Sequence, residues 1–497
     1  MNFRIKNVTT HSKIGRSEKS IAHPLFGKNL EFSDFDTVDN RNYFTIILGK
    51  NSIGKSQLLS DIAESLCLEI GEFTSRRSSS LNISMTIGSG HNLDKIVMDG
   101  RGSINENVHP WDVLPNRIVA SATTPFDKFR LSRDVIRERV SYRDDEPTRR
   151  EQRYYYTGLR DTNGRTNFRS AILRTIRGIF LNEARTVDQL SKIKLVFEFL
   201  GLRPVVQVAY SLGVMSSSRR LIEDIISGNP IDHALLENSS TGRLSRLGLL
   251  LKTDPSGLDK VRRALMRAQV NYDRGPFSSR IEVEIGQDTD AAALLSELFL
   301  LKDLRLLNFR EVFLQRHDGG EPLDILQASS GEISIISGIL GIASGIQDSS
   351  LILIDEPEIS LHPEWQDRYL ELLRETFSAF RGCHFIVATH SPIIVSDARE
   401  EDTTVLNLSH VLDGRQERGG HFGRSIDEII ATQFGVIDDN NLYVKQEVIR
   451  AANAIARGEV ATLEFKRRIA MLKKLSKNLG ASSKLGRAID NISDLTK

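Results

Sequence analysis

The chain has 497 residues, of which 66 are Lys or Arg and 65 are Asp or Glu, so its formal net charge is only +1. This length can bury a large core in two or more lobes, and the balanced charge gives no argument for nucleic acid as a partner. The two cysteines exclude a disulfide framework and a cysteine zinc site, and the absence of a long apolar stretch or apolar leader leads us to expect a cytoplasmic protein that does not enter a membrane.

A phosphate-binding loop follows the first strongly apolar run. Residues 43–48 predict a strand, residues 57–70 have apolar side chains at helical spacing, and the segment between them fits the pattern G-x-x-x-x-G-K-S. In such a loop, backbone N–H groups surround nucleotide phosphates, the lysine reaches the β- and γ-phosphates, and the serine hydroxyl binds Mg²⁺. A glycine-rich turn without a ligand is the alternative. The residues predicted to bind the nucleotide are Gly49, Lys50, Asn51, Ser52, Ile53, Gly54, Lys55, Ser56 and Gln57.

The middle of the chain is expected to form a compact, mainly helical lobe. Residues 170–182, 188–200 and 290–301 predict amphipathic helices, which Gly201, Pro204 and two later Gly- and Pro-containing turns interrupt at short intervals. Residues 130–310 contain no sustained heptad repeat, so the pattern argues against a long coiled-coil arm.

An arginine-rich segment, residues 130–185, contains 14 Arg and 8 Asp or Glu. At its centre, residues 149–160 interleave arginines with Tyr154, Tyr155 and Tyr156. Arginine and tyrosine suit phosphate contact and base stacking, and they are equally enriched at protein interfaces. Nucleic acid, a partner protein and a solvated surface therefore all remain open for this segment.

Small polar residues then precede an apolar helix predicted at residues 333–346. Ser329, Ser330 and Gly331 stand at its start, where exposed N–H groups and the helix dipole attract an anion. The same residues, followed by Glu332, also fit an ordinary helix N-cap.

Two apolar runs end in polar residues that suit phosphate chemistry. Residues 350–355 predict a parallel strand buried on both faces, which ends at Asp355 and Glu356. Asp355 is the candidate Mg²⁺ ligand, direct or through water, and Glu356 is the candidate base that orients and deprotonates the attacking water. Residues 384–389 predict the next strand, after which His390 is positioned for a γ-phosphate contact.

The end of the chain is expected to be helical over residues 441–478. From residue 445 onward it contains 12 Lys or Arg against 5 acidic residues. A basic, solvated helical hairpin and a docking element for an effector or for DNA remain equally open.

These segments, in this order, resemble the head of an ABC-type ATPase of the RecF/SMC/OLD branch. Residues 49–56 match the Walker A motif, residues 328–332 the signature motif in its SSGE form, and residues 351–356 the Walker B motif with its catalytic glutamate. Residues 360–363 resemble a D-loop of the DEPE-x-x-LHP type, and His390 matches the switch histidine.

The resemblance implies ATP and Mg²⁺ as cofactors and a homodimer or higher homo-oligomer. In that family the signature serine and glycine of one head, here within residues 329–331, contact the γ-phosphate held by the phosphate loop of the other head. This chain has one copy of each motif. It should therefore need a second chain to hydrolyse ATP.

A narrower resemblance is to ATPase subunits of bacterial anti-phage systems of the Septu or PARIS kind. Residues 124–129 resemble the SPFDKF stretch of such ATPases, and residues 425–436 resemble their tail helix. The glutamine that the wider family has in the first of these loops is missing here. The sequence also lacks a Toprim-type acidic cluster, an HNH pattern and a serine nucleophile motif. The resemblance thus implies a separately encoded nuclease of HNH or Toprim type.

We accordingly predict an α/β fold, namely an ABC-type head with a mixed sheet and flanking helices, an inserted compact helical lobe and a C-terminal helical tail. The expected divisions are 1–125 and 301–412 for the head, 126–300 for the lobe and 413–497 for the basic tail. The expected function is an ATP-hydrolysing sensor and scaffold of an anti-phage complex. A RecF-like ATPase that clamps duplex DNA is the alternative, and a detached transporter ATPase is disfavoured by the insert and by the missing glutamine.

Overall fold

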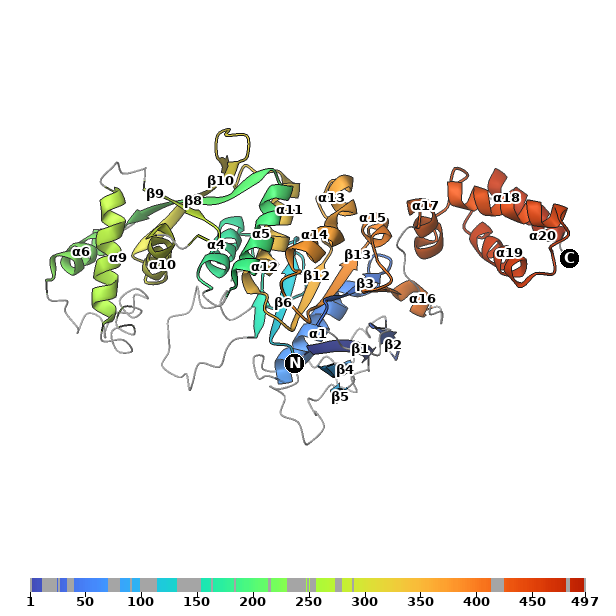
Figure 1. Ribbon diagram of the computed structural model, residues 1–497, viewed down its shortest axis with the longest axis horizontal. Coiled ribbons are helices and arrows are strands. Elements are labelled where there is room, and N and C mark those ends of the chain that lie inside the picture. The colour runs from blue at the N-terminus through green and yellow to red at the C-terminus, as the bar shows by residue number, and fades with distance from the viewer. Residues whose placement is uncertain are drawn as a thin grey trace, which may run out of the picture.

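The structure is a computed structural model, in which the elements lie along one elongated molecule (Figure 1). It describes residues 2–10, 25, 27–33, 40–69, 81–89, 92–98, 114–131, 153–161, 164–182, 185–212, 216–229, 247, 250, 256–272, 279–287, 290–412, 424–479 and 483–495. Among the helices of these ranges, none has both the length and the apolar character needed to cross a membrane.

A six-stranded parallel sheet forms the centre of the molecule, and its strand order is β14-β3-β13-β12-β6-β7. The strands are β14 (Thr403–Asn407), β3 (Tyr43–Leu48), β13 (His384–Thr389), β12 (Ser350–Asp355), β6 (Arg117–Ala122) and β7 (Tyr154–Tyr156). Every residue of β3, β12 and β13 is buried, as expected for strands covered on both faces. Because parallel strands end at one edge, the segments that follow β3, β12, β13 and β6 meet there.

Four antiparallel strands form a second sheet beside the parallel one, so the head has the predicted α/β fold, with its two strand orientations in separate sheets. Their order is β2-β1-β4-β5. The first helix, α1 (Lys55–Glu69), contacts β4 as well as β12 and β13, and one apolar cluster fills the space between the two sheets. The strands are β2 (Asn29–Glu31), β1 (Asn2–Thr10), β4 (Leu81–Ser89) and β5 (Asn92–Met98).

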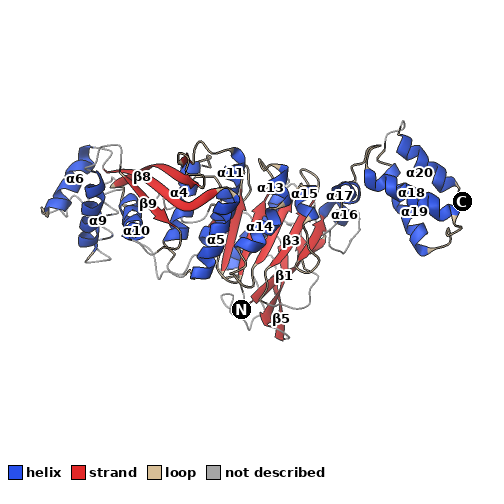
Figure 2. Ribbon diagram, turned by 45° about the horizontal axis from the view of Figure 1, so that its top comes forward, coloured by secondary structure: helices blue, strands red, loops and turns tan. Residues whose placement is uncertain are grey.

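The inserted lobe contains the three predicted helices, and it also contains a four-stranded antiparallel sheet of order β11-β10-β8-β9 that we did not predict (Figure 2). Gly201 and Pro204, which we interpreted as helix breakers, stand where β8 begins. The lobe also takes β10 and β11 from the part of the chain assigned to the head. Its elements are α4 (Phe168–Phe180), α5 (Val187–Phe199), β8 (Leu202–Leu212), α6 (Ser216–Ser227), α9 (Gly257–Tyr272), β9 (Arg280–Glu284), α10 (Asp290–Asp303), β10 (Leu307–Arg316) and β11 (Leu323–Asp324).

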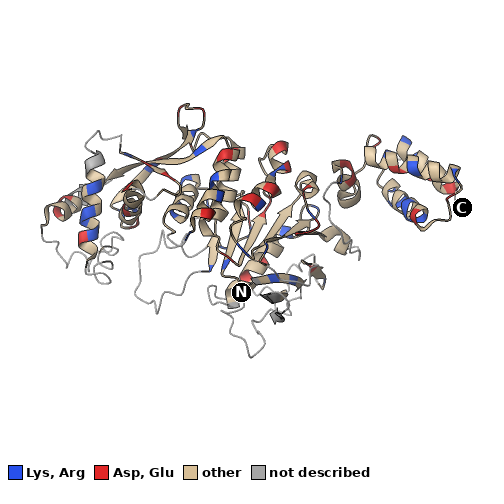
Figure 3. Ribbon diagram, viewed as in Figure 1, with Lys and Arg blue, Asp and Glu red and all other residues tan. Residues whose placement is uncertain are grey.

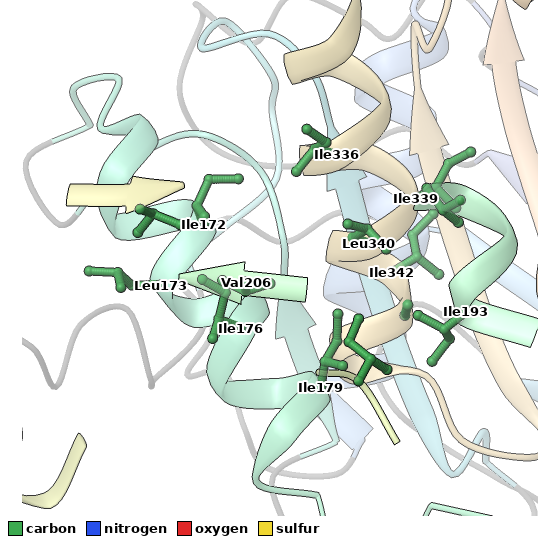
Figure 4. Packing of buried hydrophobic residues seen from close by; sticks show 14 of the residues in the cluster. Ile172, Leu173, Ile176, Ile179, Ile193, Val206, Ile336, Ile339, Leu340 and Ile342 are labelled. Carbon is green, nitrogen blue, oxygen red and sulfur yellow. The ribbon is translucent and has the colours of Figure 1, made fainter. Parts of the chain in front are cut away.

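The lobe is joined to the head by apolar packing. Figure 4 shows isoleucine and leucine side chains of α4 facing those of the helical stretch formed by α11 (Ser330–Ile335), η1 (Ile336–Leu340) and α12 (Gly341–Gly345). A Cβ on Gly178 would lie 2.6 Å from both the Cβ and the carbonyl oxygen of Ser344, so glycine is what lets α4 approach α12 this closely. The same apolar cluster includes residues of β3 and β12, so the lobe and the head share one core.

Two of the three tyrosines in the predicted Arg–Tyr cluster have a structural role. Tyr154 and Tyr156 lie on β7 and are each only 1% exposed. Rings that are buried in a sheet cannot stack on bases, so these two do not support the nucleic-acid interpretation. Residues 149–152, the first part of the predicted Arg–Tyr cluster, lie outside the described residues.

The tail lies at the opposite end of the molecule from the lobe (Figures 1 and 2). Its three longest helices pack around their own apolar cluster, which extends to Ala431 of η2. The buried side chain of Asn407, at the end of β14, donates to the carbonyl oxygen of Gln433 at 2.7 Å and so attaches η2 to the head. The elements are α17 (Ile426–Ile429), η2 (Ile430–Phe434), α18 (Leu442–Ala456), α19 (Leu463–Ser476) and α20 (Lys484–Asp494); the head's other helices are α13 (Pro363–Asp367), α14 (Tyr369–Thr376), α15 (Pro392–Ser396) and α16 (Leu408–Leu412).

Candidate active site

The phosphate loop leaves β3 and enters α1, which begins at Lys55. Gly54 has a φ of 98°, in a region that favours glycine, and a Cβ on Gly49 would lie 2.8 Å from Cγ2 of Ile53. The loop conformation therefore depends on both glycines of the motif. The first N–H groups of a helix have no partner within it, so the start of α1 forms a cradle for an anion.

Lys55 points back across this loop. Its Nζ donates to the carbonyl oxygen of Gly49 at 3.1 Å and contacts both ring nitrogens of His390, with Nδ1 at 3.2 Å. Burial lowers the pKa of Lys55 to about 8, against the opposing effect of Glu356, Glu358 and Asp355. A weakly solvated ammonium group therefore stands beside the loop, where a phosphate would find little competition from water.

His390 is a neutral imidazole at pH 7. Burial, and then the charge of Lys55, lower its pKa to about 4. Its Nε2 lies 3.6 Å from Oε1 of Glu356, which is too long for a hydrogen bond. A neutral ring has one N–H donor and one acceptor nitrogen, so His390 can accept from Lys55 or donate to a phosphate oxygen.

Ser56 and Asp355 form the part of the site that could hold Mg²⁺. The Ser56 hydroxyl donates to Oδ1 of Asp355 at 3.0 Å. Burial raises the pKa of Asp355 to about 7, and Glu356 and Asp127 add to the shift, while Ser56 and Lys55 oppose it. In the described ranges no group of three His, Cys, Asp or Glu residues could hold a metal alone. Mg²⁺ needs only one or two carboxylates, because water and phosphate oxygens supply its other ligands, so this pair fits it.

Glu356 lies at a turn with an unusual backbone. Its φ is 49°, its N–H donates to the carbonyl oxygen of Ala388 at 2.9 Å, and its own carbonyl oxygen accepts from Oγ1 of Thr123 at 3.2 Å. These bonds attach the turn to β13 and to the loop after β6. The Glu356 side chain is 30% exposed, so its carboxylate can reach a water molecule near the phosphate loop.

Glu358 is a site residue that we missed in the sequence. Its half-buried carboxylate accepts from Oγ1 of Thr389 at 2.8 Å and from the backbone N–H of His390 at 2.5 Å. Burial raises the pKa of Glu358, against these hydrogen bonds. The carboxylate thus orients the switch segment that carries His390. The sequence signal was a second acid two residues after Glu356, in a turn that we assigned to no role.

The predicted signature residues are not joined to the phosphate loop within one chain. The Ser329 hydroxyl accepts from the Glu332 N–H at 3.3 Å, and the Glu332 carboxylate accepts in return from the Ser329 N–H at 2.7 Å, which is a helix capping box. Ser329 and Ser330 remain exposed. A Cβ on Gly331 would lie 3.1 Å from the carbonyl oxygen of Ser360, so this turn packs against the predicted D-loop. Across residues 40–69 and 290–412, which are fully described, no hydrogen bond connects it to the loop.

Two residues near the phosphate loop have their side chains bonded within the protein. The Gln57 amide donates to Asp61 within α1 at 2.7 Å, so its side chain is engaged away from the loop. In the segment after β6, the carboxylate of Asp127 is buried against Arg160 at 2.6 Å and accepts from the Tyr156 hydroxyl at 2.8 Å. Arg160 and Tyr156 thereby fix the loop that normally carries the family glutamine.

Comparisons with known proteins agree with a nucleotide site. A protein-family model described as "AAA domain, putative AbiEii toxin, Type IV TA system" matches residues 44–396. The "Retron Vc95 probable ATPase" of Vibrio cholerae serotype O1 biovar El Tor is 26% identical over 124 residues, which are 22% of this chain and 24% of that protein. The "Retron Ec83 probable ATPase" of Escherichia coli is 36% identical over 81 residues, or 14% of each chain, and "Protein ea59" of Escherichia phage lambda is 34% identical over 73 residues, or 15% of this chain and 14% of that one. The chain therefore matches about a quarter or less of each relative's length.

Solved structures of two kinds are similar over most of the chain, but with low scores. The Smc head domain with an extended coiled coil, bound to the C-terminal domain of ScpA, from Pyrococcus furiosus has a TM-score of 0.30 at 13% identity, and covers 81% of this chain and 93% of its own. An inward-facing "putative metal-chelate type ABC transporter" has a TM-score of 0.25 at 13% identity, with 87% and 89% covered. The family match, in contrast, spans more than two thirds of the chain and includes the phosphate loop, Asp355 and His390. The chain belongs to this AAA-domain family of P-loop ATPases.

Proposed function

We propose that this protein is the ATP-hydrolysing sensor and scaffold subunit of a prokaryotic anti-phage complex. Two copies would dimerise, or assemble into a higher homo-oligomer, through sandwiched ATP, and the assembly would control a separately encoded nuclease of HNH or Toprim type. The main support is the convergence of Lys55, Ser56, Asp355, Glu356 and His390 at one edge of the parallel sheet. Further support comes from two relatives that are named retron probable ATPases.

The site supports hydrolysis of the γ-phosphate through the following roles. The N–H groups at the start of α1 and the Lys55 ammonium would bind the phosphates. Mg²⁺, held by Ser56 and Asp355, would offset the phosphate charge when bound. Glu356 would orient a water molecule and accept its proton, and neutral His390 would donate a hydrogen bond to a γ-phosphate oxygen.

The proposed dimer follows from what one chain lacks. In a single copy, Ser329 and Ser330 are exposed and bond only within their own turn, while the phosphate loop has no donor from that turn. A second copy could supply Ser329, Ser330 and Gly331 to the γ-phosphate, and the first copy would do the same in return. The two sites would then close together, in an isologous interface.

The tail supports the proposed nuclease partner. Large apolar side chains with at least a third of their surface exposed are concentrated there, and Leu463 and Leu495 are 64% and 74% exposed. A groove of about 480 Å³ lies between the start of α19 and the end of α20, and Lys466 and Lys473 line it together with Phe465 and Ile469. The Lys and Arg residues of α19 are coloured blue on the ribbon in Figure 3. An apolar groove with basic edges fits an amphipathic acidic segment.

The test is co-expression of the chain with the nuclease encoded by its gene neighbour. We expect the nuclease to co-purify, and the Lys466→Glu/Lys473→Glu chain to bind it roughly tenfold more weakly, because like charges would then meet. Arg467→Glu, which changes the same charge on the same helix outside the groove, is the matched control. If no nuclease is recovered and the chain binds duplex DNA tightly and in a salt-sensitive way, the DNA-clamp alternative replaces this proposal.

Glu358→Ala is expected to lower kcat for ATP by roughly tenfold or more while the affinity for ATP changes little. The reason is that the carboxylate holds the backbone of His390 and not the phosphate loop. Glu358→Gln should recover much of the loss, since an amide can still accept from the His390 N–H. Steady-state kinetics and ATP titrations on both variants, with exposed Glu364→Ala as control, would check this. A loss confined to KM would contradict a role through His390.

A further inference from the structure

A cavity of about 640 Å³ lies between the phosphate loop and the C-terminal helices. One wall is the first part of the loop, residues 48–50, together with residues 409–410 of α16. The other walls come from η2, from Tyr443 of α18 and from the C-terminal half of α19. Small-molecule sites commonly have volumes of ~300–1,000 Å³, so this cavity has the size of a ligand site. Apart from Gly49 and Lys50 of the phosphate loop, none of its lining residues has a role in the hydrolysis described above.

The side chains around the cavity suit a planar heterocycle. Phe434 and Tyr443 supply aromatic rings, and Gln433 and Asn478 supply amides. The Asn478 amide nitrogen donates to the carbonyl oxygen of Gly435 at 2.9 Å. This hydrogen bond orients the amide group, whose oxygen is an acceptor. Aromatic faces that stack on a base, with ordered amides at its edge, are what proteins use to bind nucleobases.

The charge around the cavity suits a nucleotide whose phosphates extend from the cavity into the phosphate loop. Lys50, Lys474 and Lys477 line it, together with Arg424, which is paired with Glu428 at 3.7 Å. Glu428 is the one acid in the lining, and within the described residues none of the three lysines has an ion pair of its own. Lys50 belongs to the phosphate loop itself, so this positive charge is continuous with the site of Lys55.

We propose that this cavity receives the base and ribose of the ATP whose phosphates lie in the phosphate loop, so that the C-terminal helices form part of the nucleotide site. This inference rests on the proposed function. It has a regulatory consequence, because α19 contributes to two sites. Lys474 and Leu475, near its C-terminal end, line the cavity, and Phe465 and Lys466, near its start, line the partner groove. ATP bound in the cavity would stabilise the position of α19 and so present the groove to the partner.

Photo-cross-linking with 8-azido-ATP tests the location directly on the full chain. We expect the labelled peptides to come from residues 431–443 or 471–478, and excess ATP or Lys55→Ala to prevent the labelling. Adducts only elsewhere in the chain would overturn the proposal. Labelling of these peptides that persists in Lys55→Ala would also overturn it, because the cavity would then be a separate site.

A matched pair of titrations tests the chemistry. Tyr443→Ala should weaken ATP binding by roughly ten- to a hundredfold, the usual effect of losing a stacking ring, while Tyr443→Phe should retain the affinity. Inorganic tripolyphosphate, which has no base, should bind all three chains equally. Lys474→Ala should likewise weaken ATP, whereas Lys473→Ala, one residue away and facing the groove, should not. Equal losses for ATP and tripolyphosphate in Tyr443→Ala would overturn the proposal, and a failure of Lys55→Ala to reduce tripolyphosphate binding would count against the phosphate site instead.

Discussion

The Lys55→Ala chain is expected to lose ATP binding by at least roughly a hundredfold. Lys55 is 4% exposed, and among the described residues its ammonium group hydrogen-bonds only to neutral groups, namely the Gly49 carbonyl oxygen and the His390 ring. In the complex this ammonium group would pair with a phosphate. Removing one member of a buried, hydrogen-bonded charge pair weakens binding by about 2–5 kcal/mol, and about 1.4 kcal/mol is a tenfold change in affinity. Isothermal titration calorimetry with ATP and Mg²⁺ measures the loss.

Lys128→Ala is the control for this experiment, because Lys128 is exposed and lies in the nearby loop after β6. It should bind ATP as the unmodified chain does. A thermal melt of each apo protein separates loss of binding from loss of fold. If Lys55→Ala binds ATP within about threefold of the parent, the phosphate loop does not hold the nucleotide.

The pH dependence of ATP binding should report the same group. Lys55 has a pKa of about 8 in the free protein, and a bound triphosphate favours the charged form and raises that pKa. Below pH 8 the lysine is already protonated, so its contribution to the affinity is constant. Above it, binding takes up a proton, and affinity falls by up to roughly tenfold per pH unit. Calorimetry at about pH 9 in two buffers should detect this uptake, which Lys55→Arg should lack because arginine stays charged.

Glu356→Gln is expected to reduce ATP turnover by roughly 10²–10⁴-fold with ATP affinity nearly unchanged. The substitution keeps the shape and the backbone bonds of the turn but removes the carboxylate that would accept a proton from water. Because binding persists while hydrolysis stops, an ATP-dependent dimer should accumulate. Phosphate release assays and sedimentation with ATP measure the two effects.

Glu364→Gln provides the comparison, since Glu364 is an exposed acid in the first turn of α13. Its turnover should equal that of the parent. Turnover at the parent rate in Glu356→Gln would show that another group activates the water. A fall in affinity equal to the fall in rate would instead assign Glu356 to nucleotide binding.

The local parts of the site could be predicted from residues that are neighbours in the chain. The phosphate loop is one contiguous segment whose glycines and lysine are needed for reasons of backbone geometry and charge. Asp355 and His390 each follow an apolar run, and such runs in a parallel sheet end at one edge. For this reason Ser56 and Asp355 can be expected to meet although they are 299 positions apart, and the Ser56 hydroxyl does donate to Asp355.

The sheet of the inserted lobe was not predicted because its strands depend on distant partners. β8 pairs with β10, so that Val208 lies opposite Val312, more than a hundred residues away. From sequence alone, Gly201 and Pro204 end a helix, and nothing local indicates that a strand follows. Likewise Tyr154 and Tyr156 resemble a binding surface until β7 is seen to pair with β6, which buries them.

The sequence by itself therefore determined the nucleotide loop, the acids and histidine at the strand ends, and the family resemblance, because each is encoded in a short segment with its own backbone or burial requirement. The tertiary structure alone decided that Glu358 orients His390, that Asp127 is held by Arg160, and that the tail helices face the phosphate loop across a cavity. These features are contacts between segments far apart in the chain. Their partners are chosen by how the sheets and helices pack, and no local pattern records that choice.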